Sequence, residues 1–532
     1  MKKEIVDIVP PEIGFDEVHL KTYLTRKYGI PNEDECHVQL VKRSIDARAR
    51  QVKVNIRVNL YINELPENRI TYRKEYQDVR KSRQVIIVGS GPAGMFAALR
   101  FLELGIRPVI LERGKDVRAR RRDLAAINKD HLVNPDSNYC FGEGGAGTYS
   151  DGKLYTRSKK RGNFDRILEI FVSHEANPLI LVESHPHIGT NKLPKVVGNI
   201  RQSILDAGGE MHFETRVVDL VIEGDELKGV VDQHGVRYEG DAVLLATGHS
   251  ARDIYDLLNK KGIYLERKSF ALGVRIEHPQ SIIDQIQYHC PSRGPYLPAA
   301  SYSLVTQVAI RNQQKGVFSF CMCPGGFIVP AATAPGEIVI NGMSPSRRNS
   351  RFANSGIVVS VDEDDLKPFL ESGVLAGIEF QRSIERKAFE MGGSSQTAPA
   401  QRLVDFLDGK ISNTLPESSY QPGVRSAQLS ELLPPQITQR LKIAFRDFGE
   451  KMKGYLTNEA QLVAVESRTS SPVRIPRDPE TLEHVRLKRF FPAGEGAGYA
   501  GGIASAAIDG ERCANKIAEK YFSGMATGTE DE

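Results

Sequence analysis

The chain has 532 residues, of which 40% are hydrophobic and 26% charged, which is typical of a globular protein but too long for one core. No apolar run approaches the ~18 residues that span a bilayer, and no apolar segment follows the first lysines, so we expect a cytoplasmic protein without a membrane partner. The six cysteines are scattered along the chain, which argues against a disulfide framework.

The formal net charge of +4 is confined to the N-terminal segment. Residues 1–83 hold 17 Lys+Arg against 13 Asp+Glu, whereas the rest of the chain holds 54 of each. So small an excess usually serves solubility, and we expect no nucleic-acid partner. It leaves open one other interpretation, in which the basic segment binds RNA.

Residues 1–82 resemble a separate α+β domain. The pattern predicts a strand over 5–9, a helix over 15–29 that ends at Gly29, and alternating strands over 36–46 and 52–62. This order suggests a small ferredoxin-like sheet. The polar stretch after it, which is poorly periodic, predicts a linker up to the next apolar strand.

A glycine-rich turn follows the apolar strand that begins at Val85. Gly89, Gly91 and Gly94 form G-x-G-x-x-G, and Pro92 and Ala93 open a helix. The first glycine permits a tight turn, the second lets the backbone approach a pyrophosphate, and the third lets helix and strand pack closely. The helix N-terminus then faces the phosphates.

An acidic residue closes the second strand of this unit. Glu112 lies 23 residues beyond Gly89, which suits a carboxylate that accepts ribose hydroxyls. It would repel a 2′-phosphate, so the ligand is FAD or NAD rather than NADP. The basic run after it includes Arg113 and Arg118, and we expect Arg118 to reach the pyrophosphate.

Three later stretches favour FAD, because FAD is longer than one nucleotide half-site and its flavin needs contacts of its own. They are the glycine-rich segment 138–157, the strand and small-residue turn 241–248, and the segment 490–503. Within the first two, the expected cofactor contacts are Gly144, Gly145, Gly147, Thr148, Ala246, Thr247 and Gly248.

Together these stretches resemble the two-dinucleotide-binding-domain flavoproteins, which include the glutathione-reductase-like enzymes. The motifs FGEGGAGTYSDGKL, HPHIGTNKL, FCMCPGG, ESRTSSPVRIPR and AGEGAGYAGGI further resemble a bacterial family of FAD-dependent dehydrogenases with no settled substrate, over nearly the whole chain. The resemblance implies FAD as cofactor. It also implies contacts from Val217, Gly494, Glu495, Gly501, Gly502 and Ile503, with Glu495 standing where many members have Asp.

The fold class expected is α/β in three parts. We predict an N-terminal ferredoxin-like α+β domain over 1–82, a discontinuous Rossmann-like FAD-binding domain over 83–268 and 485–532, and an inserted β-rich α+β substrate domain over 269–484 that carries a helix over 375–393. No second strand–GxGxxG–helix unit occurs between 155 and 480. A nicotinamide would therefore bind transiently at the flavin, or a protein carrier would supply electrons.

Lys153 and His187 are candidates for the chemistry. Lys153, after the glycine-rich loop, or Thr148 would lie near the flavin, where a cation would favour the anionic reduced form, although a solvated loop lysine is an equal alternative. His185 and His187 suit proton transfer, although two histidines in a Pro-containing loop are more often structural.

Arginines near the last flavin strand are candidates for substrate binding. Arg468 or Arg474 would anchor an anionic substrate or close over the cofactor, with an interdomain salt bridge as the alternative. Arg275 is a weaker candidate of the same kind. Cys321 and Cys323 are interpreted as small buried cysteines, with a redox or substrate-facing role left open, and we expect no metal site.

The sequence therefore predicts an FAD-dependent oxidoreductase. Its substrate would be a small organic molecule, for which the arginines indicate an anion, and hydride would be transferred at flavin N5, with NAD(P)H or a protein carrier as the electron partner. Two alternatives remain: a flavoprotein that binds or modifies RNA through the N-terminal domain, and a non-catalytic protein that holds a flavin for interaction with others.

Overall fold

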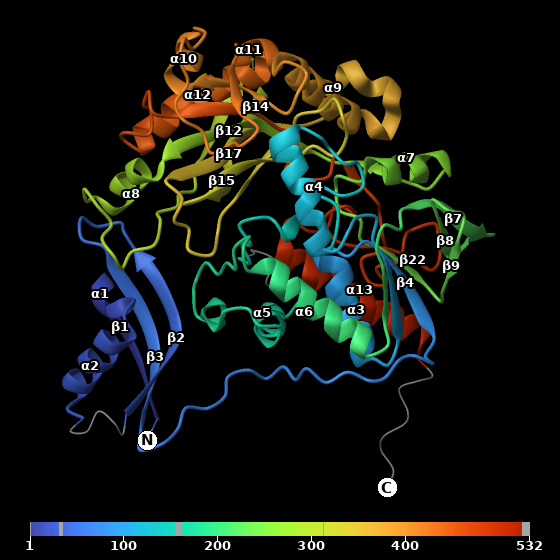
Figure 1. Ribbon diagram of the computed structural model, residues 1–532, viewed down its shortest axis with the longest axis horizontal. Helices are drawn as coiled ribbons and strands as arrows, with labels where there is room; N and C mark the ends of the chain where they lie inside the picture. Colours follow the sequence, from blue (N-terminus) through green and yellow to red (C-terminus); the bar gives the residue numbers. More distant parts are fainter. Residues whose placement is uncertain (1, 31–35, 156–161, 312, 524–532) are drawn as a thin grey trace.

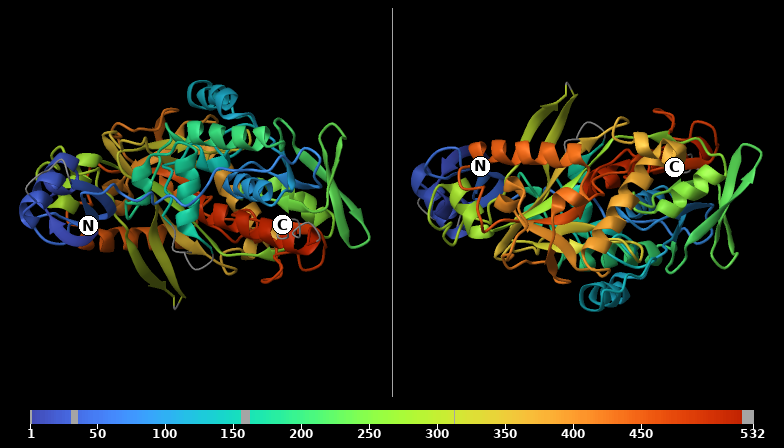
Figure 2. Two further views of the ribbon diagram at one scale, coloured as in Figure 1. Left: turned by 90° about the horizontal axis from the view of Figure 1, so that it is seen from below. Right: turned by 90° about the horizontal axis from the view of Figure 1, so that it is seen from above.

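The computed structural model describes residues 2–30, 36–155, 162–311 and 313–523. The molecule is elongated, with a small N-terminal unit at one end and an antiparallel three-stranded sheet at the other (Figures 1 and 2). That sheet consists of β7 (Val217–Glu223), β8 (Glu226–Asp232) and β9 (Arg237–Glu239). In the described ranges, no helix is long and apolar enough to cross a membrane.

The N-terminal unit is an antiparallel sheet covered by helices. Its elements are β1 (Lys2–Val9), α1 (Pro11–Gly14), α2 (Glu17–Tyr28), β2 (Cys36–Asp46) and β3 (Lys53–Ile62), with strand order β1-β3-β2. The predicted strand–helix–strand–strand order is present. A ferredoxin-like fold would need a further helix and a fourth strand after β3, and residues 63–83 contain neither, because the chain leaves as an irregular segment along the body (Figure 1).

The central sheet is parallel and has the order β22-β10-β4-β5-β6. Its strands are β4 (Gln84–Val88), β5 (Arg107–Leu111), β6 (Glu210–His212), β10 (Val243–Leu245) and β22 (Phe490–Pro492). The strand β22 begins at Phe490, about 250 residues after Val243, where its neighbour β10 begins. Two distant parts of the chain therefore build one sheet.

Apolar residues on both faces of β4 explain why the sheet is covered on both sides. Val85 and Ile87 pack with α3 (Pro92–Glu103), α6 (Leu193–Asp206) and α13 (Ile503–Tyr521), whereas Ile86 and Val88 pack with β7, β8 and α7 (Arg252–Lys260). The helices α3 and α13 touch closely, because a side chain at Gly510 would overlap with the carbonyl of Ala93. The helices α4 (Val117–Asp130) and α5 (Phe164–Ser173) complete this part.

A second sheet of seven strands stands above the parallel one in Figure 1, with order β13-β14-β17-β12-β20-β18-β19. Its strands are β12 (Phe270–Pro279), β13 (Val305–Ile310), β14 (Gln313–Cys323), β17 (Phe352–Val361), β18 (Ala398–Arg402), β19 (Val424–Ser426) and β20 (Gln461–Glu466). Its helices are α8 (Gln280–Tyr288), α9 (Ala376–Met391), α10 (Leu403–Asp408), α11 (Leu429–Leu432) and α12 (Pro435–Lys451).

The helix α9 agrees with the sequence expectation, but α12 was not predicted. It buries Leu441, Ala444, Phe445 and Phe448 against the seven-stranded sheet, at the spacing of one helical face. Short elements complete the fold: β11 (Glu266–Arg267), β15 (Phe327–Pro330), β16 (Ile340–Met343), β21 (Val473–Arg474), and the 3₁₀ turns η2 (Gly145–Gly147), η4 (Pro178–Leu181) and η5 (Lys367–Leu375). The pair β11–β21 lies where the chain enters and leaves the seven-stranded sheet.

Candidate functional site

One cavity of about 390 Å³ lies between the carboxyl ends of the parallel strands and the seven-stranded sheet. The loops around Gly91, Gly145 and Gly501 all line it. From the seven-stranded sheet, Phe320 and Cys321 form the opposite wall. Segments roughly four hundred positions apart in the sequence therefore meet at a single site.

The first glycine turn has the geometry that the motif requires. Gly89 has φ 101°, and a Cβ there would lie 2.6 Å from the carbonyl oxygen of Ala246. A side chain at Gly94 would overlap with the carbonyl oxygen of Gly89, so this glycine serves helix–strand packing. At Gly91, by contrast, a Cβ would meet no atom within 4 Å, which leaves open space at the N-terminus of α3.

Glu112 is held in place by backbone donors at the end of β5. Its Oε2 accepts from Ser90 N at 2.9 Å and from Ser90 Oγ at 2.7 Å, and its Oε1 accepts from Gly114 N at 2.9 Å and Gly142 N at 3.0 Å. The carboxylate thereby ties the glycine turn to the loop 142–147. It also lines the cavity, where a ribose hydroxyl would share one of these oxygens with a donor already present, since the four bonds take up the lone-pair sites of the carboxylate.

Arg120, not Arg118, supports the loop 142–147. The guanidinium of Arg120 is fully buried and donates to Asn138 O at 2.7 Å, Glu143 O at 3.0 Å and Gly145 O at 2.9 Å. Arg118 is exposed on the first turn of α4 and does not line the cavity, so the expectation that it reaches the pyrophosphate is not supported. The helix periodicity turns one arginine inward and the other outward.

The C-terminal glycine segment is fixed by a buried ion pair. Arg477 donates to Asp509 at 2.6 and 3.0 Å and to Pro492 O at 2.7 Å, and Asp509 accepts from Gly494 N at 2.8 Å. This chain of contacts locks the end of β22 onto α13. It thereby sets the position of Glu495, the next residue, at the cavity wall.

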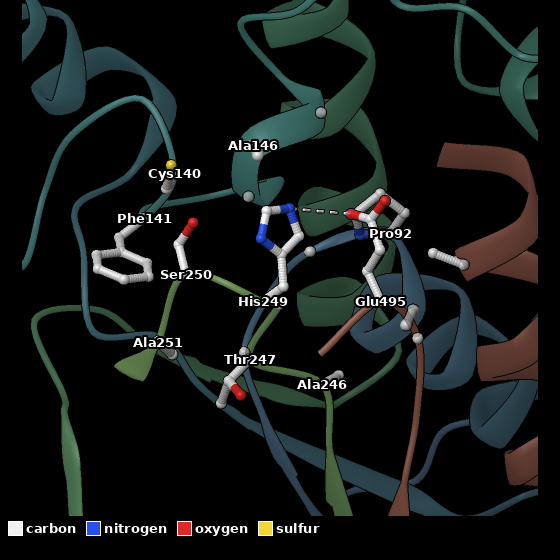
Figure 3. A pocket seen from close by; sticks show the side chains of 18 of the residues that line it. Pro92, Cys140, Phe141, Ala146, Ala246, Thr247, His249, Ser250, Ala251 and Glu495 are labelled. Atoms are coloured by element: carbon white, nitrogen blue, oxygen red, sulfur yellow. Dashed lines mark ion pairs between the residues drawn. The ribbon is translucent and has the colours of Figure 1, made fainter. Parts of the chain in front are cut away.

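His249 and Glu495 face each other across the cavity (Figure 3). The Nε2 atom of His249 lies 3.9 Å from Oε2 of Glu495. Burial raises the pKa of the Glu495 carboxyl to about 7, and burial, with Arg468 and Arg252 acting in the same direction, lowers the pKa of His249 to about 4. At neutral pH the imidazole is therefore uncharged, so the contact is not a full ion pair.

Most of the residues expected to touch a cofactor line this cavity. They are Gly89, Gly91, Pro92, Ala93, Glu112, Arg113, Gly145, Gly147, Val217, Ala246, Thr247, Gly248, Gly494, Glu495, Gly501, Gly502 and Ile503. Four others do not line it: Gly94, Arg118, Gly144 and Thr148. Gly144 and Thr148 instead shape the loop, because a side chain at Gly144 would overlap with Oγ1 of Thr148, which donates to Glu143 O at 2.9 Å.

Of the two non-arginine catalytic candidates, only Lys153 faces the cavity. Its Nζ donates to Met322 O, at the edge of β14, and lies 4.0 Å from Oδ2 of Asp151. His187 does not line the cavity, and its Nε2 atom lies 3.1 Å from Ser346 O. Burial lowers the pKa of His187 to about 4, so the structure gives this histidine a positioning contact rather than access to a substrate.

The arginine candidates are engaged in internal ion pairs. Arg468 lines the cavity, but its Nη2 donates to Glu385 at 2.8 Å and Glu337 at 2.9 Å, and its Nη1 donates to Thr333 at 2.6 Å. Since Arg252 of α7 donates to the same Glu385, this cluster joins the two sheets, and the salt-bridge alternative fits better than a substrate anchor.

Arg474 and Arg275 do not line the cavity. The Arg474 side chain is 44% exposed, and Nη1 lies 3.9 Å from Glu266. Arg275 is fully buried and donates to Glu466 at 2.7 Å and to Asn354 at 2.7 Å. Neither guanidinium is free to make a two-point contact with a substrate in the cavity.

The sequence analysis missed several residues of the cavity wall. His249 directly follows the Ala246–Gly248 turn, so its position beside the cofactor could have been inferred from that turn. Phe320 comes from β14 of the seven-stranded sheet and Asn341 from β16 of the two-stranded sheet β15–β16, and no local pattern marks either residue. Only the pairing of β14 with β17 brings Phe320 to the cavity.

The residues present fit FAD. Open space at Gly91, Gly501 and Gly502, where a Cβ would meet no atom within 4 Å, forms a cradle at the N-termini of α3 and α13 that suits phosphate and a flat ring. Glu112 supplies the acceptor for a ribose, and the three glycine loops supply a long, continuous wall.

Comparison with protein families agrees with this assignment. Residues 82–125 match the FAD binding domain model, residues 269–469 match "FAD-dependent protein, C-terminal domain-like", and residues 1–61 match a domain of unknown function, DUF8436. The family match and the cavity geometry together show that FAD is the cofactor.

Curated and solved proteins give further similarities. Over 184 residues the chain is 28% identical to thiamine thiazole synthase of Aeropyrum pernix. The matched region is 31% of this chain and 55% of that protein. The flavin-dependent brominase Bmp2 has 12% identity and a TM-score of 0.37, and covers 84% of this chain and 80% of its own. A geranylgeranyl bacteriochlorophyll reductase-like protein from Thermoplasma acidophilum has 12% identity and a TM-score of 0.33, with coverages of 84% and 80%.

The similarity that spans nearly the whole chain is to an uncharacterized protein of Clostridium beijerinckii. The two are 39% identical over 520 residues, which is 94% of this chain and 96% of that protein. The chain therefore belongs to the same family as this Clostridium beijerinckii protein, and it is an FAD-dependent flavoprotein.

Proposed function

We propose that the protein is an FAD-dependent oxidoreductase that exchanges hydride with a small organic substrate at flavin N5. One observation carries the proposal: the cavity does not end at the nucleotide turns but continues to Phe320 and Cys321 of the seven-stranded sheet and to Asn341 of β16. This second wall leaves a place for a reactant beside the cofactor, at a seam between two units where ligand sites are frequent.

FAD, when bound, supplies the two-electron chemistry. The protein supplies charge and proton exchange around it. The Lys153 ammonium group faces the cavity and favours an anionic substrate or a negatively charged cofactor. Because the pKa of Glu495 is about 7, this carboxyl can both hold and release a proton near neutrality, while His249 beside it, whose pKa is about 4, stays uncharged and offers a hydrogen bond.

The other two interpretations have less support. Several cations of the N-terminal unit are paired with carboxylates: Lys27 with Asp7 at 2.6 Å, Arg48 with Asp46 at 2.6 Å, and Lys2 with Glu67 at 2.7 Å. Such pairing weakens the case for an RNA surface. A non-catalytic flavin holder would have no use for an open cavity with a lysine, a histidine and a carboxyl on its walls.

We further infer that the family lies within the glutathione-reductase-like flavoproteins and that the protein is a dehydrogenase, as its resemblance implies. We also infer that the chain has the three expected domains and that the protein is cytoplasmic. The parallel sheet with its glycine turn, covered by helices on one face and by β7–β9 on the other, supports the superfamily. Since the sequence offers no second strand–GxGxxG–helix unit between 155 and 480 that could bind a nicotinamide nucleotide, the electron donor would meet the flavin through the open cavity.

Anaerobic reduction of the purified yellow protein tests the proposal. NADH, NADPH and reduced ferredoxin are compared by the bleaching of the flavin absorbance, and a panel of organic oxidants is then screened for recovery of the colour. An enzyme should be reduced by one donor much faster than free FAD is. A flavin that every donor and oxidant leaves as slow as free FAD would argue against an oxidoreductase.

Lys153→Met tests the charge at the site. Removal of the ammonium group should make reduction less favourable and lower the flavin midpoint potential, because a nearby cation stabilises the anionic reduced form. Lys195→Met is the matched control, since Lys195 lies on an exposed turn of α6 and pairs with Glu175 at 2.7 Å. An unchanged potential in the Lys153 variant would remove Lys153 from the proposed chemistry.

A further inference from the structure

The strand β14 has an irregular point on the wall of the cavity that lies opposite the nucleotide turns. Phe320 pairs with Gly356 and Cys323 pairs with Asn354, so two residues of β14 oppose a single residue of β17 and form a bulge. The two bulged residues are left out of the regular pairing of the sheet. Their backbone carbonyl groups are therefore free to accept hydrogen bonds from side chains.

Two cations bind the backbone carbonyl groups of this bulge. Lys153 Nζ donates to Met322 O, and Arg275 Nη1 donates to Cys321 O at 3.2 Å. Lys153 lines the cavity and its side chain is 37% exposed, whereas Arg275 is completely buried behind the wall. An ammonium group has three hydrogens, so two of those on Lys153 remain for a ligand in the cavity.

The charge of Lys153 is not cancelled by a hydrogen-bonded carboxylate. Oδ2 of Asp151 lies 4.0 Å from Nζ of Lys153, beyond hydrogen-bonding distance, and the same oxygen is bonded to Nη2 of Arg348 at 2.5 Å. The ammonium group therefore faces the cavity with most of its charge available to a ligand.

Arg275 also fixes the amide group of Asn341, a residue of β16 that lines the cavity. Oδ1 of Asn341 accepts from Gly342 N at 2.7 Å and from Nη2 of Arg275 at 3.4 Å. Both partners can only donate, so the oxygen atom of the amide must be the atom that faces them. Asn341 is half-buried, and its amide nitrogen has no acceptor among the described residues, so this donor is left to the cavity.

The guanidinium group of Arg275 is itself held in one orientation. Its Nε donates to Glu466 at 2.7 Å, and its Nη1 donates to Asn354 at 2.7 Å. Gly342 lets β16 approach this closely, because a side chain there would overlap with Nη1 of Arg275 and Oδ1 of Asn354. The orientation of the Asn341 amide is therefore imposed by a fixed donor behind the wall.

We propose that Lys153 and Asn341 bind the carboxylate group of the substrate, with Arg275 as the positioning residue for the amide. This inference rests on the proposed oxidoreductase function and names the class of its substrate, an organic carboxylic acid in its anionic form. The ammonium group supplies the charge, the amide supplies a neutral donor, and a carboxylate offers an oxygen atom to each. Phe320, on the same wall, provides an apolar surface for the body of the substrate.

The other cations of the cavity wall are already paired with carboxylates. Arg113 and Arg216 both pair with Asp136, at 2.8 and 3.4 Å, and Arg468 pairs with two buried glutamates. Within the described ranges, Lys153 is thus the cation of this wall that remains for a ligand. One positive charge matches a carboxylate, whereas a phosphate monoester carries nearly two negative charges and three acceptor oxygens.

The test compares the binding of benzoate and of its neutral isostere benzamide to the FAD-loaded protein. Isothermal titration calorimetry and the difference absorbance of the flavin report both ligands without turnover. In the wild type, benzoate should bind at least about 10-fold more tightly than benzamide, because hydrogen bonds to a charged group are the stronger ones. Lys153→Met should abolish this preference.

Asn341→Asp removes the donor and keeps the shape of the side chain. The variant retains the oxygen that Gly342 and Arg275 bind, but a second carboxylate oxygen replaces the amide nitrogen. It should reverse the preference, because this oxygen repels benzoate and accepts a hydrogen bond from the amide of benzamide. The affinity for FAD should stay that of the wild type. Asn259→Asp, at an exposed position of α7, is the matched control and should bind both ligands as the wild type does.

A double-mutant comparison tests the positioning role of Arg275. Arg275→Lys keeps a cation opposite Glu466 but loses the Nη2 contact to Asn341, so it should weaken benzoate binding by about 3- to 10-fold. In the Asn341→Ala background the same change should have no further effect. A purely structural role would weaken binding equally in both backgrounds and would remove Arg275 from the proposal. If Arg275→Lys does not fold, the ligand preference and Asn341→Asp decide the proposal by themselves.

Three results would overturn the carboxylate site. The first is a wild type without a preference for benzoate, including one that binds neither ligand. The second is an Asn341→Asp variant with unchanged affinity for benzoate. The third is an Asn341→Asp variant that keeps the preference for benzoate but binds FAD at least about 10-fold more weakly, because the amide would then face the cofactor.

The failure of this inference is distinguishable from the failure of the proposed function. If the ligand preferences are found but no donor reduces the flavin, the carboxylate site stands and the oxidoreductase proposal fails. If a donor reduces the flavin rapidly but benzoate is not preferred, the oxidoreductase proposal stands and the carboxylate site is excluded.

Discussion

His249 and Glu495 form the only His–carboxylate contact on the wall of the cavity among the described residues, with Nε2 and Oε2 3.9 Å apart. They come from the ends of β10 and β22, which are neighbours in the parallel sheet, so the strand order alone brings them together. In a usual ion pair the pKa of the carboxyl is lowered and that of the imidazole is raised. Here the pKa of Glu495 is raised and that of His249 is lowered, so an uncharged imidazole lies beside a carboxyl that titrates near neutrality.

Replacement of Glu495 by Gln should stabilise the FAD-free protein at alkaline pH. Because burial raises the folded-state pKa of Glu495 from 4.5 to about 7, the wild type loses stability as the pH rises through this interval, while below it both states are protonated. The variant should match the wild type near about pH 4 and exceed it by up to about 3 kcal/mol near about pH 8. Thermal unfolding across this range measures the difference.

Glu519→Gln is the control for this experiment, since Glu519 lies exposed on α13 and pairs with Lys516 at 2.6 Å. Its pH profile should parallel that of the wild type. If the Glu495 and Glu519 variants show the same profile, the environment of Glu495 does not perturb its titration.

Alanine at Gly91 should separate cofactor binding from folding. A Cβ at Gly91 would meet no protein atom within 4 Å and its φ of −70° suits any residue, so the FAD-free protein should keep its stability. The methyl group would occupy the space into which a pyrophosphate fits, so we expect FAD affinity to fall at least about 10-fold, or about 1.4 kcal/mol. Fluorescence quenching of added FAD measures this loss.

Gly94→Ala is the matched comparison on the same helix. Here the added methyl group would overlap with the carbonyl oxygen of Gly89, so the protein itself should be destabilised by about 1–3 kcal/mol. If the two FAD-free variants were equally stable, Gly94 would not be required for helix–strand packing, and the distinction from Gly91, which leaves room for the ligand, would be wrong.

Glu112→Gln should weaken FAD binding by about 10- to 100-fold, because charge-assisted hydrogen bonds contribute about 1.5–3 kcal/mol. The amide nitrogen would also face backbone donors from Ser90 or Gly142, which the carboxylate now satisfies. Equilibrium titration of the FAD-free variant checks the prediction. Glu239→Gln, at an exposed position of β9, should retain the wild-type affinity.

Arg468→Ala should destabilise the protein by about 3–5 kcal/mol, because it leaves the buried carboxylates of Glu337 and Glu385 to share the cation of Arg252. Denaturant unfolding measures the effect. A role in substrate anchoring alone would instead leave stability unchanged and raise KM, an outcome that would restore the original expectation for Arg468.

The local sequence pattern was sufficient to predict the structure wherever residues close together in the sequence determine it. The strand–glycine turn–helix unit at Gly89–Gly94 and the position of Glu112 follow from rules about residues within about 25 positions of each other. The expectation for Arg118 failed because three successive arginines and their neighbours share one helix, and only the packing of α4 selects Arg120 as the buried one.

The sequence by itself determined the cofactor class, the parallel sheet with its nucleotide turn, and the return of the chain to that turn near its C-terminus. Glycines at fixed spacing next to apolar strands have few other uses, so they identify such a site without a structure. The tertiary structure decided the rest of the cavity. The seven-stranded sheet brings Cys321 to the wall, and neighbouring parallel strands bring His249 opposite Glu495, through contacts between residues that are distant in sequence and carry no mark in its local pattern.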